Sequence, residues 1–176
     1  MLCLSQWNAN QEWPDVSTEK LLEKTEEWLS PYLSDIKSTD DLKAIDLENV
    51  LKYSLIPEQQ ETLEKIAPAT IEVPSGSIIR LDYQANGSPP ILAVRLQEIF
   101  GMVNTPHVNN GKVNVLMHIL SPGYKIVQTT MDLESFWTST YFEVRKELRI
   151  RYKKHAWPED PLVAQPLKGA KKSNKT

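Results

Sequence analysis

The sequence contains a single cysteine, few glycines and no long hydrophobic segment. Cys3 alone cannot form an intramolecular disulfide or a four-cysteine zinc site. Six glycines among 176 residues exclude a collagen-like chain. No apolar run approaches the roughly 18 residues of a membrane-spanning helix, and residues 1–4 are too short for the apolar core of a signal peptide. We therefore expect a cytoplasmic protein that needs no disulfide and does not enter a membrane.

Motifs for nucleotide hydrolysis and for common hydrolases are also missing. Gly111-Lys112 is followed by Val113 and lacks the upstream glycine of a phosphate-binding loop. No Asp-Glu-x-His box is present to hold magnesium. The histidines, His107, His118 and His155, lie far apart without cysteine or carboxylate at metal-ligand spacing. We expect no catalytic residue, metal or cofactor in this chain. An independent small enzyme using His118 stays as a weak alternative.

The net charge of −3 hides two halves of opposite sign. Residues 1–66 carry 14 Asp and Glu against six Lys and no Arg, a net charge of −8. Residues 67–176 carry nine Asp and Glu against 14 Lys and Arg, a net charge of +5. The basic half is compatible with nucleic-acid contact even though the whole chain is acidic. The alternative is that both halves present ordinary solvated faces.

The first 67 residues predict a small helical unit after an irregular opening. Residues 1–16 have no clear period, and we interpret them as the remainder of an upstream module in which Trp7 and Trp13 are buried. Helical spacing predicts a helix from Ser17 to about residue 29, followed by a short turn over residues 38–44. Asp46 can cap another helix, and Pro57 fits the first position of the next one. Residues 17–67 are therefore predicted to form a helical subdomain.

From residue 68 the pattern changes to strands. Alternation and β-branched residues predict strands over 70–73, 77–83, 113–120 and 125–129. We also predict a helix over 91–100, and one from Asp132 to about residue 152 with a break near 138–140. This order indicates an α+β domain over 68–161, with a mostly antiparallel sheet and helices packed on it. Residues 162–176 are polar and basic and predict a disordered tail.

One segment, residues 141–157, combines basic and aromatic side chains. Cationic groups neutralise phosphates, and aromatic faces stack on unpaired bases, so this segment is a candidate nucleic-acid site. The alternative is a solvated amphipathic helix whose aromatic residues are core. Arg95, a lone charge among apolar residues, is expected to form a structural salt bridge. The candidate nucleic-acid-binding residues are Arg145, Lys146, Arg149, Arg151, Lys153, Lys154, His155 and Trp157.

Three long strings carry a resemblance to a known family. They are PPILAVRLQEIFGMVNTP (89–106), LMHILSPGYKIVQTTMDLESFW (116–137) and EVRKELRIRYKKHAWPEDP (143–161). Together with residues 13–33 and 73–83 they resemble the C-terminal region of the HrpB-type ATP-dependent helicases of bacteria, which are relatives of the DEAH-box RNA helicases. The chain departs from the family at Ile150, Lys153 and Ala156, and in the turn Gly123-Tyr124-Lys125, where small residues are usual.

The resemblance implies an accessory role beside a motor. ATP and magnesium would be bound by motor domains elsewhere in the parent protein, in the same chain or a separate one. This chain alone would therefore neither hydrolyse ATP nor unwind nucleic acid. Two roles remain open: contact with single-stranded RNA or DNA, and a structural or docking role that braces the motor without touching nucleic acid.

Overall fold

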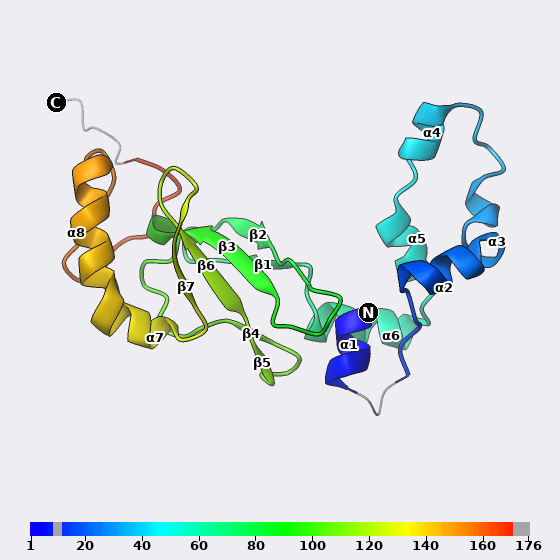
Figure 1. The fold of residues 1–176 in the computed structure, drawn as a ribbon, viewed down its shortest axis with the longest axis horizontal. Coiled ribbons are helices and arrows are strands. Elements are labelled where there is room, and N and C mark those ends of the chain that lie inside the picture. The colour runs from blue at the N-terminus through cyan, green and yellow to red at the C-terminus, as the bar shows by residue number, and fades with distance from the viewer. Residues whose placement is uncertain (9–11, 171–176) are drawn as a thin grey trace. The chain divides into compact units, whose positions relative to one another are not determined.

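The computed structural model describes residues 1–8 and 12–170, which divide into two compact units (Figure 1). The N-terminal unit comprises Met1–Ala67 and the loop Ala85–Ser88. The C-terminal unit comprises Pro68–Gln84 and the chain from Pro89 onward. The chain thus leaves the second unit for a four-residue loop that packs with the first.

The N-terminal unit is helical, as predicted, but two details differ. Residues 2–7 form a helix where an irregular opening was expected. The single helix expected from Ser17 is divided at Lys24, whose φ of −114° and ψ of 25° depart from helical geometry. The elements are α1 (Leu2–Trp7), α2 (Thr18–Glu23), α3 (Thr25–Trp28), the 3₁₀ turn η1 (Ser30–Tyr32), α4 (Thr39–Lys43), α5 (Leu47–Tyr53) and α6 (Pro57–Ile66).

Side-chain caps fix the starts of these short helices. The Ser17 side chain accepts a hydrogen bond from the Lys20 backbone, and Asp46 accepts one from the Asn49 backbone at 3.1 Å. Pro57 occupies the start of α6, where its missing N–H is not needed. These three predictions are confirmed. They succeed because a cap depends on residues only three positions apart.

The core of the N-terminal unit is small. Its buried apolar side chains come from α1, α5, α6 and the α5–α6 connection, and α1 is also tied to the loop Ala85–Ser88. Trp7 donates its indole N–H to Gly87 O at 2.6 Å, and Gln6 Nε2 donates to Ala85 O at 3.2 Å. None of the side chains described in α2, α3, η1 and α4 is buried. The buried apolar residues are Cys3, Leu4, Val50, Leu55 and Ile66.

The C-terminal unit is built on three small sheets. An antiparallel pair, β1 (Thr70–Glu72) with β2 (Ile78–Arg80), confirms the predicted hairpin. A second antiparallel pair, β4 (His107–Val108) with β5 (Val113–Asn114), confirms the predicted Asn109-Asn110-Gly111 turn, whose residues all have positive φ. The largest sheet has the order β3 (Ile91–Arg95), β6 (Leu116–Leu120) and β7 (Ile126–Thr130). Of the four strand pairs in the described part of this unit, three are antiparallel and one, β3 with β6, is parallel, and the fold class is α+β, as predicted.

The predicted helix over 91–100 is wrong. Ile91–Arg95 is strand β3, which pairs in parallel with β6, and Leu96–Glu98 forms the 3₁₀ turn η2. Leu, Ala, Arg, Gln and Glu are good helix formers, so local propensity favours the wrong structure here. Burial alternates along β3, with Leu92 and Val94 in the core, and long-range pairing with β6 overrides that propensity.

A helical arm follows the sheet in the chain. It consists of α7 (Leu133–Ser135), the π-helical turn η3 (Phe136–Thr140) and α8 (Tyr141–Arg151). Asp132 caps its start, and η3 coincides with the predicted break at 138–140. Trp137 packs near Phe100 with ring centroids 6.4 Å apart and donates its indole N–H to Met102 O at 2.7 Å. These contacts fasten the arm to the segment that follows β3.

The chain after α8 folds back onto the C-terminal unit. Gly101 N donates to Pro161 O at 3.0 Å, and Leu167 N donates to Gln97 O at 2.8 Å. Residues 162–170 therefore make long-range hydrogen bonds, which corrects the expected disordered tail over this range. The rest of that expectation, residues 171–176, lies outside the described residues.

The hydroxyl of Tyr141 links α8 to this returning segment. It is buried and donates to Pro158 O at 2.8 Å, and burial raises its pKa, so it stays a protonated donor. We expect Tyr141→Phe to lower the free energy of unfolding by about 1–2 kcal/mol, because the partly buried hydrogen bond to the Pro158 carbonyl is lost. Urea unfolding followed by circular dichroism measures the change. The matched control is Tyr53→Phe, at a tyrosine that is 67% exposed. Equal stability of the two variants would contradict this role.

Candidate nucleic-acid interface

Helix α8 brings part of the predicted basic group together on one face. Phe142, Arg145, Lys146 and Arg149 recur at helical spacing and, with Glu143 and Ile150, line a surface hollow of about 370 Å³. Leu148 lies on the opposite side and is buried. Phe142, Arg145 and Arg149 therefore lie close together on α8.

Within this face, Lys146 and Arg149 are the exposed cations. Phe142 beside them is 48% exposed, so its ring is accessible from solvent. Two exposed cations with an accessible ring match what contact with a phosphate and an adjacent base requires.

Arg145 has a different role. Its Nε donates to Trp157 O at 3.0 Å, its guanidinium lies 3.5 Å from Glu159, and its side chain is only 18% exposed. It holds the returning segment against α8, so it is not free to follow a phosphate backbone.

Trp157 is also structural. It is 8% exposed, and its indole N–H donates to Tyr152 O at 2.9 Å. A buried ring cannot stack on a base, which argues against a direct contact for this predicted residue. Its burial could not be predicted from the sequence, because nothing in the residues after the helix indicates that the chain folds back.

The remaining predicted residues lie at the end of α8 and just after it, where the chain turns at Tyr152. Arg151, Lys153 and Lys154 are exposed. His155 is half-buried and packs edge-on against Tyr152, with ring centroids 6.1 Å apart. Burial lowers the pKa of His155, and the Arg95 charge lowers it further. Arg95 therefore lies within electrostatic reach of this basic turn.

Arg95 forms the predicted salt bridge. Its Nε lies 2.7 Å from a carboxylate oxygen of Glu98, and both side chains are largely buried. Burial tends to raise the pKa of Glu98, but hydrogen bonds from Ser77 and Arg95 outweigh it and the pKa is lowered. Glu98 is thus a stable anion that fixes Arg95.

Tyr124, which is not among the predicted site residues, lies beside Arg95. The Arg95 guanidinium lies 5.1 Å from the centroid of the Tyr124 ring, and Tyr124 is 68% exposed. The available signal was a bulky aromatic residue in a turn where the family usually has small ones.

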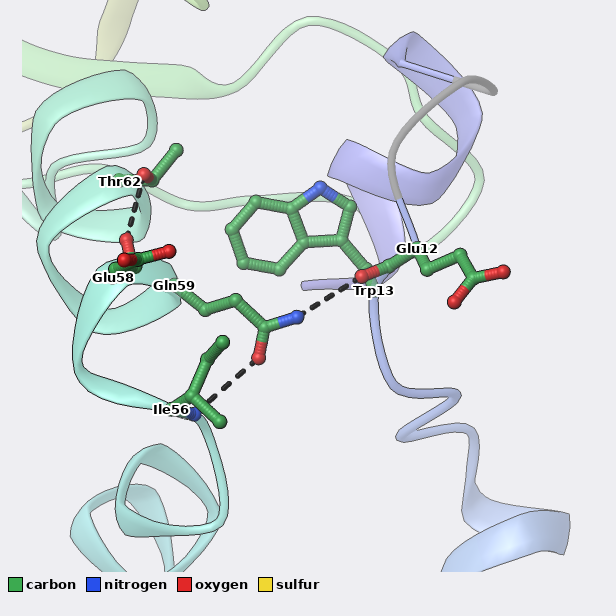
Figure 2. Close-up of a pocket in the computed structure, with 6 residues that line it drawn as sticks. All are labelled: Glu12, Trp13, Ile56, Glu58, Gln59 and Thr62. Atoms are coloured by element: carbon green, nitrogen blue, oxygen red, sulfur yellow. Dashed lines mark hydrogen bonds between the residues drawn. The ribbon is translucent and has the colours of Figure 1, made fainter.

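A separate hollow of about 250 Å³ lies in the N-terminal unit (Figure 2). Gln59 Nε2 donates to Glu12 O at 3.1 Å and so ties this segment to α6. The Trp13 indole nitrogen is buried without a hydrogen-bond partner among the described residues, and Figure 2 shows it on the ring edge facing away from Gln59. The lining mixes Trp13 and Ile56 with polar groups and offers no phosphate-binding cation. The residues around it are Glu12, Trp13, Ile56, Glu58, Gln59 and Thr62.

The other two histidines lie elsewhere in the C-terminal unit. His118 is half-buried in β6, between Ala93 of β3 and Thr129 of β7. His107 is exposed in β4. In the described part of the chain, no cluster of three or more His, Cys, Asp or Glu side chains could hold a metal ion. Likewise, residues 1–8 and 12–170 contain no helix with the length and apolar character to cross a membrane.

Comparison with known proteins defines the class: the C-terminal region of an ATP-dependent helicase. A family model described as "ATP-dependent helicase C-terminal" matches residues 28–161. The chain therefore belongs to the HrpB C-terminal family. The ATP-dependent RNA helicase HrpB of Escherichia coli strain K12 is 39% identical over 172 residues, which cover 98% of this chain and 21% of that protein.

Two solved structures are also similar. The crystal structure of the E. coli DExH-box NTPase HrpB matches 94% of this chain with a TM-score of 0.81 at 39% identity, and 20% of that chain is covered. A crystal structure of the Escherichia coli DEAH/RHA helicase HrpB matches 89% with a TM-score of 0.68 at 38% identity, again over 20% of its length. The present chain thus spans about a fifth of these proteins.

The two neighbouring cations on α8 should behave differently when removed. Arg145→Ala should lower the free energy of unfolding by about 1.5–3 kcal/mol, because the Trp157 carbonyl loses a charged donor. Lys146→Ala, at an exposed position of the same helix, should change it by less than about 0.5 kcal/mol. Chemical unfolding of the two variants measures the difference. An unchanged free energy of unfolding in Arg145→Ala would show that Arg145 is a free surface cation.

Proposed function

We propose that this chain is an accessory region of an ATP-dependent RNA helicase and contributes an RNA contact to its motor. The observation that carries the proposal is the exposed pair Lys146 and Arg149 on α8, with the half-exposed Phe142 beside them. The exposed cations Arg151, Lys153 and Lys154 continue the positive charge past the end of the helix. In this proposal, ATP and magnesium are bound by the motor domains of the parent protein.

Charge separation between the units favours this location. Residues 1–66 carry a net charge of −8 and repel a polyanion, whereas residues 67–176 carry +5. Each phosphate neutralised by a cation releases condensed counterions, so affinity should depend steeply on salt. A contact through phosphates positions RNA without reading its sequence, as an accessory region of a motor requires.

A salt titration tests the RNA contact. Binding of the full chain to a labelled single-stranded RNA is measured by fluorescence anisotropy at increasing salt. The double variant Lys146→Ala/Arg149→Ala should bind more weakly, and its log–log slope should be shallower by about 1.4, since each single-strand phosphate contact contributes about 0.7.

The matched control removes two lysines from the acidic unit. Lys20 and Lys24 are exposed and lie near Glu23 and Glu27 at 2.6 and 3.5 Å, so Lys20→Ala/Lys24→Ala removes the same charge. This control should leave affinity and slope unchanged. If the two double variants weaken RNA binding equally, the effect comes from the net charge of the chain and not from a site on α8. No binding by the wild-type chain at low salt would end the proposal.

A specific observation also favours the docking role, through the N-terminal unit. Helices α2, α3 and α4 bury no side chain within the described chain, yet Leu22 is 71% exposed and Leu42 is 48% exposed. Helices that short are not stable without tertiary packing. Exposed apolar residues on such helices are typical of a surface that another domain covers. We propose that the motor region of the parent helicase covers them.

Sedimentation tests the docking role. A separately produced fragment carrying the motor domains of the parent helicase should co-sediment with this chain. Leu22→Glu should weaken the complex because it places a charge in the covered surface. The variant's own thermal unfolding should not change, since Leu22 is 71% exposed in the isolated chain. Two independent species with the wild-type chain would contradict docking, as would unchanged binding by Leu22→Glu.

A further inference from the structure

Tyr124 adopts a backbone conformation that bulky residues avoid. Its φ is +60°, in the left-handed region, and it lies in the turn between β6 and β7. A residue with a Cβ is disfavoured there, and strain of this kind gathers at functional sites. Despite this cost, the side chain is 68% exposed and gains little from burial. Its position therefore calls for a reason other than packing.

The turn that carries Tyr124 is rigid. Ser121 and Lys125 exchange hydrogen bonds, with Ser121 N donating to Lys125 O at 2.8 Å and Lys125 N donating to Ser121 Oγ at 3.2 Å. Gly123 lies against Tyr152, since a Cβ built on it would lie 2.6 Å from the Tyr152 hydroxyl. The turn is thus fixed against the residue at which α8 ends.

The Tyr124 ring is also supported on one face. Arg95 places its guanidinium 5.1 Å from the ring centroid, a cation–π arrangement. Arg95 is itself held by Glu98 and by a hydrogen bond from its guanidinium to Lys168 O. One face of the ring therefore rests on an immobile cation, and most of the side chain remains accessible.

The turn that carries this ring contains one exposed lysine and lies against the residue that precedes two more. Lys125 follows Tyr124 directly and is exposed. Ser121 Oγ lies 3.5 Å from Tyr152 Oη, so the turn adjoins the start of the exposed Lys153-Lys154 pair. A preorganised aromatic face beside several cations is the usual construction of a site for an unpaired nucleotide, in which the base stacks and the phosphates meet lysines.

We propose that Tyr124 stacks on an unpaired base of the bound RNA, with Arg95 supporting the ring from behind. The proposal rests on the RNA contact proposed above and adds to it a preference for single strands. Bases in a duplex are already stacked and paired, so only a single-stranded or frayed segment can offer a face to Tyr124.

Variants at Tyr124 separate stacking from charge. Tyr124→Ala should weaken binding of a single-stranded oligoribonucleotide about 5- to 150-fold, the range for loss of one stacked base, with little change for a blunt duplex. Tyr124→Phe keeps the ring and should bind within about twofold of wild type. The matched control, Tyr53→Ala, removes a tyrosine of similar exposure, 67%, from the acidic unit and should have no effect.

Photocrosslinking of the wild-type chain gives a measurement that does not depend on how a variant folds. A single-stranded RNA carrying 5-iodouridine should crosslink to Tyr124, as mapped by mass spectrometry. A crosslink confined to Phe142, or Tyr124→Ala binding as tightly as wild type, would overturn the stacking proposal. If Lys146→Ala/Arg149→Ala still weakens binding in that case, the RNA contact stands without Tyr124. Absence of any wild-type binding would overturn both.

Discussion

The parallel pairing of β3 with β6 is the constraint on which the rest of the C-terminal unit depends. Its register sets Arg95 opposite Leu120, the last residue of β6. The β6–β7 turn begins one residue later, so Arg95 lies next to Tyr124 because of this register. A shift by one residue would turn Leu92 and Val94 out of the core and Arg95 away from the turn. The buried apolar residues of β3 thus determine where an exposed aromatic residue and its supporting cation meet.

The parts of the fold that could be predicted from the sequence are those that depend on local contacts. Caps at Ser17 and Asp46 and the turn at Asn109-Asn110-Gly111 depend on neighbours within a few residues, and the sequence pattern predicts them. Strand β3 could not be predicted in this way, because its partner β6 lies more than 20 residues away and its own residues favour a helix. The fold-back of residues 162–170 is missed for the same reason. Leu167 pairs with Gln97, far back in the chain.

At the candidate site, the positions of exposed cations could be predicted from the sequence, but the exposure of the aromatic side chains could not. Cations are almost always at the surface, so Lys146 and Arg149 could be assigned from the sequence. An aromatic residue can be either core or surface, and only tertiary structure decides which. Trp157, the aromatic residue among the predicted nucleic-acid-binding residues, is covered because the segment after α8 turns back and Arg145 holds it there. Tyr124 is uncovered because a rigid turn with positive φ projects it from the sheet. In the structure, Tyr124 and not Trp157 is therefore the accessible aromatic residue of this pair.

The two units differ in how much of their apolar surface they bury within themselves. The C-terminal unit buries a continuous core from β3, β6 and the helical arm, and it carries the net positive charge. Among its described residues, the N-terminal unit buries five apolar side chains, and none of them belongs to α2, α3 or α4; this unit is strongly acidic. Since the chain spans about a fifth of its helicase relatives, an uncovered acidic helical surface fits contact with protein rather than with RNA. The two proposed roles, RNA contact and docking, are thus compatible if each belongs to a separate unit, because a polyanion is attracted by the basic unit and repelled by the acidic one.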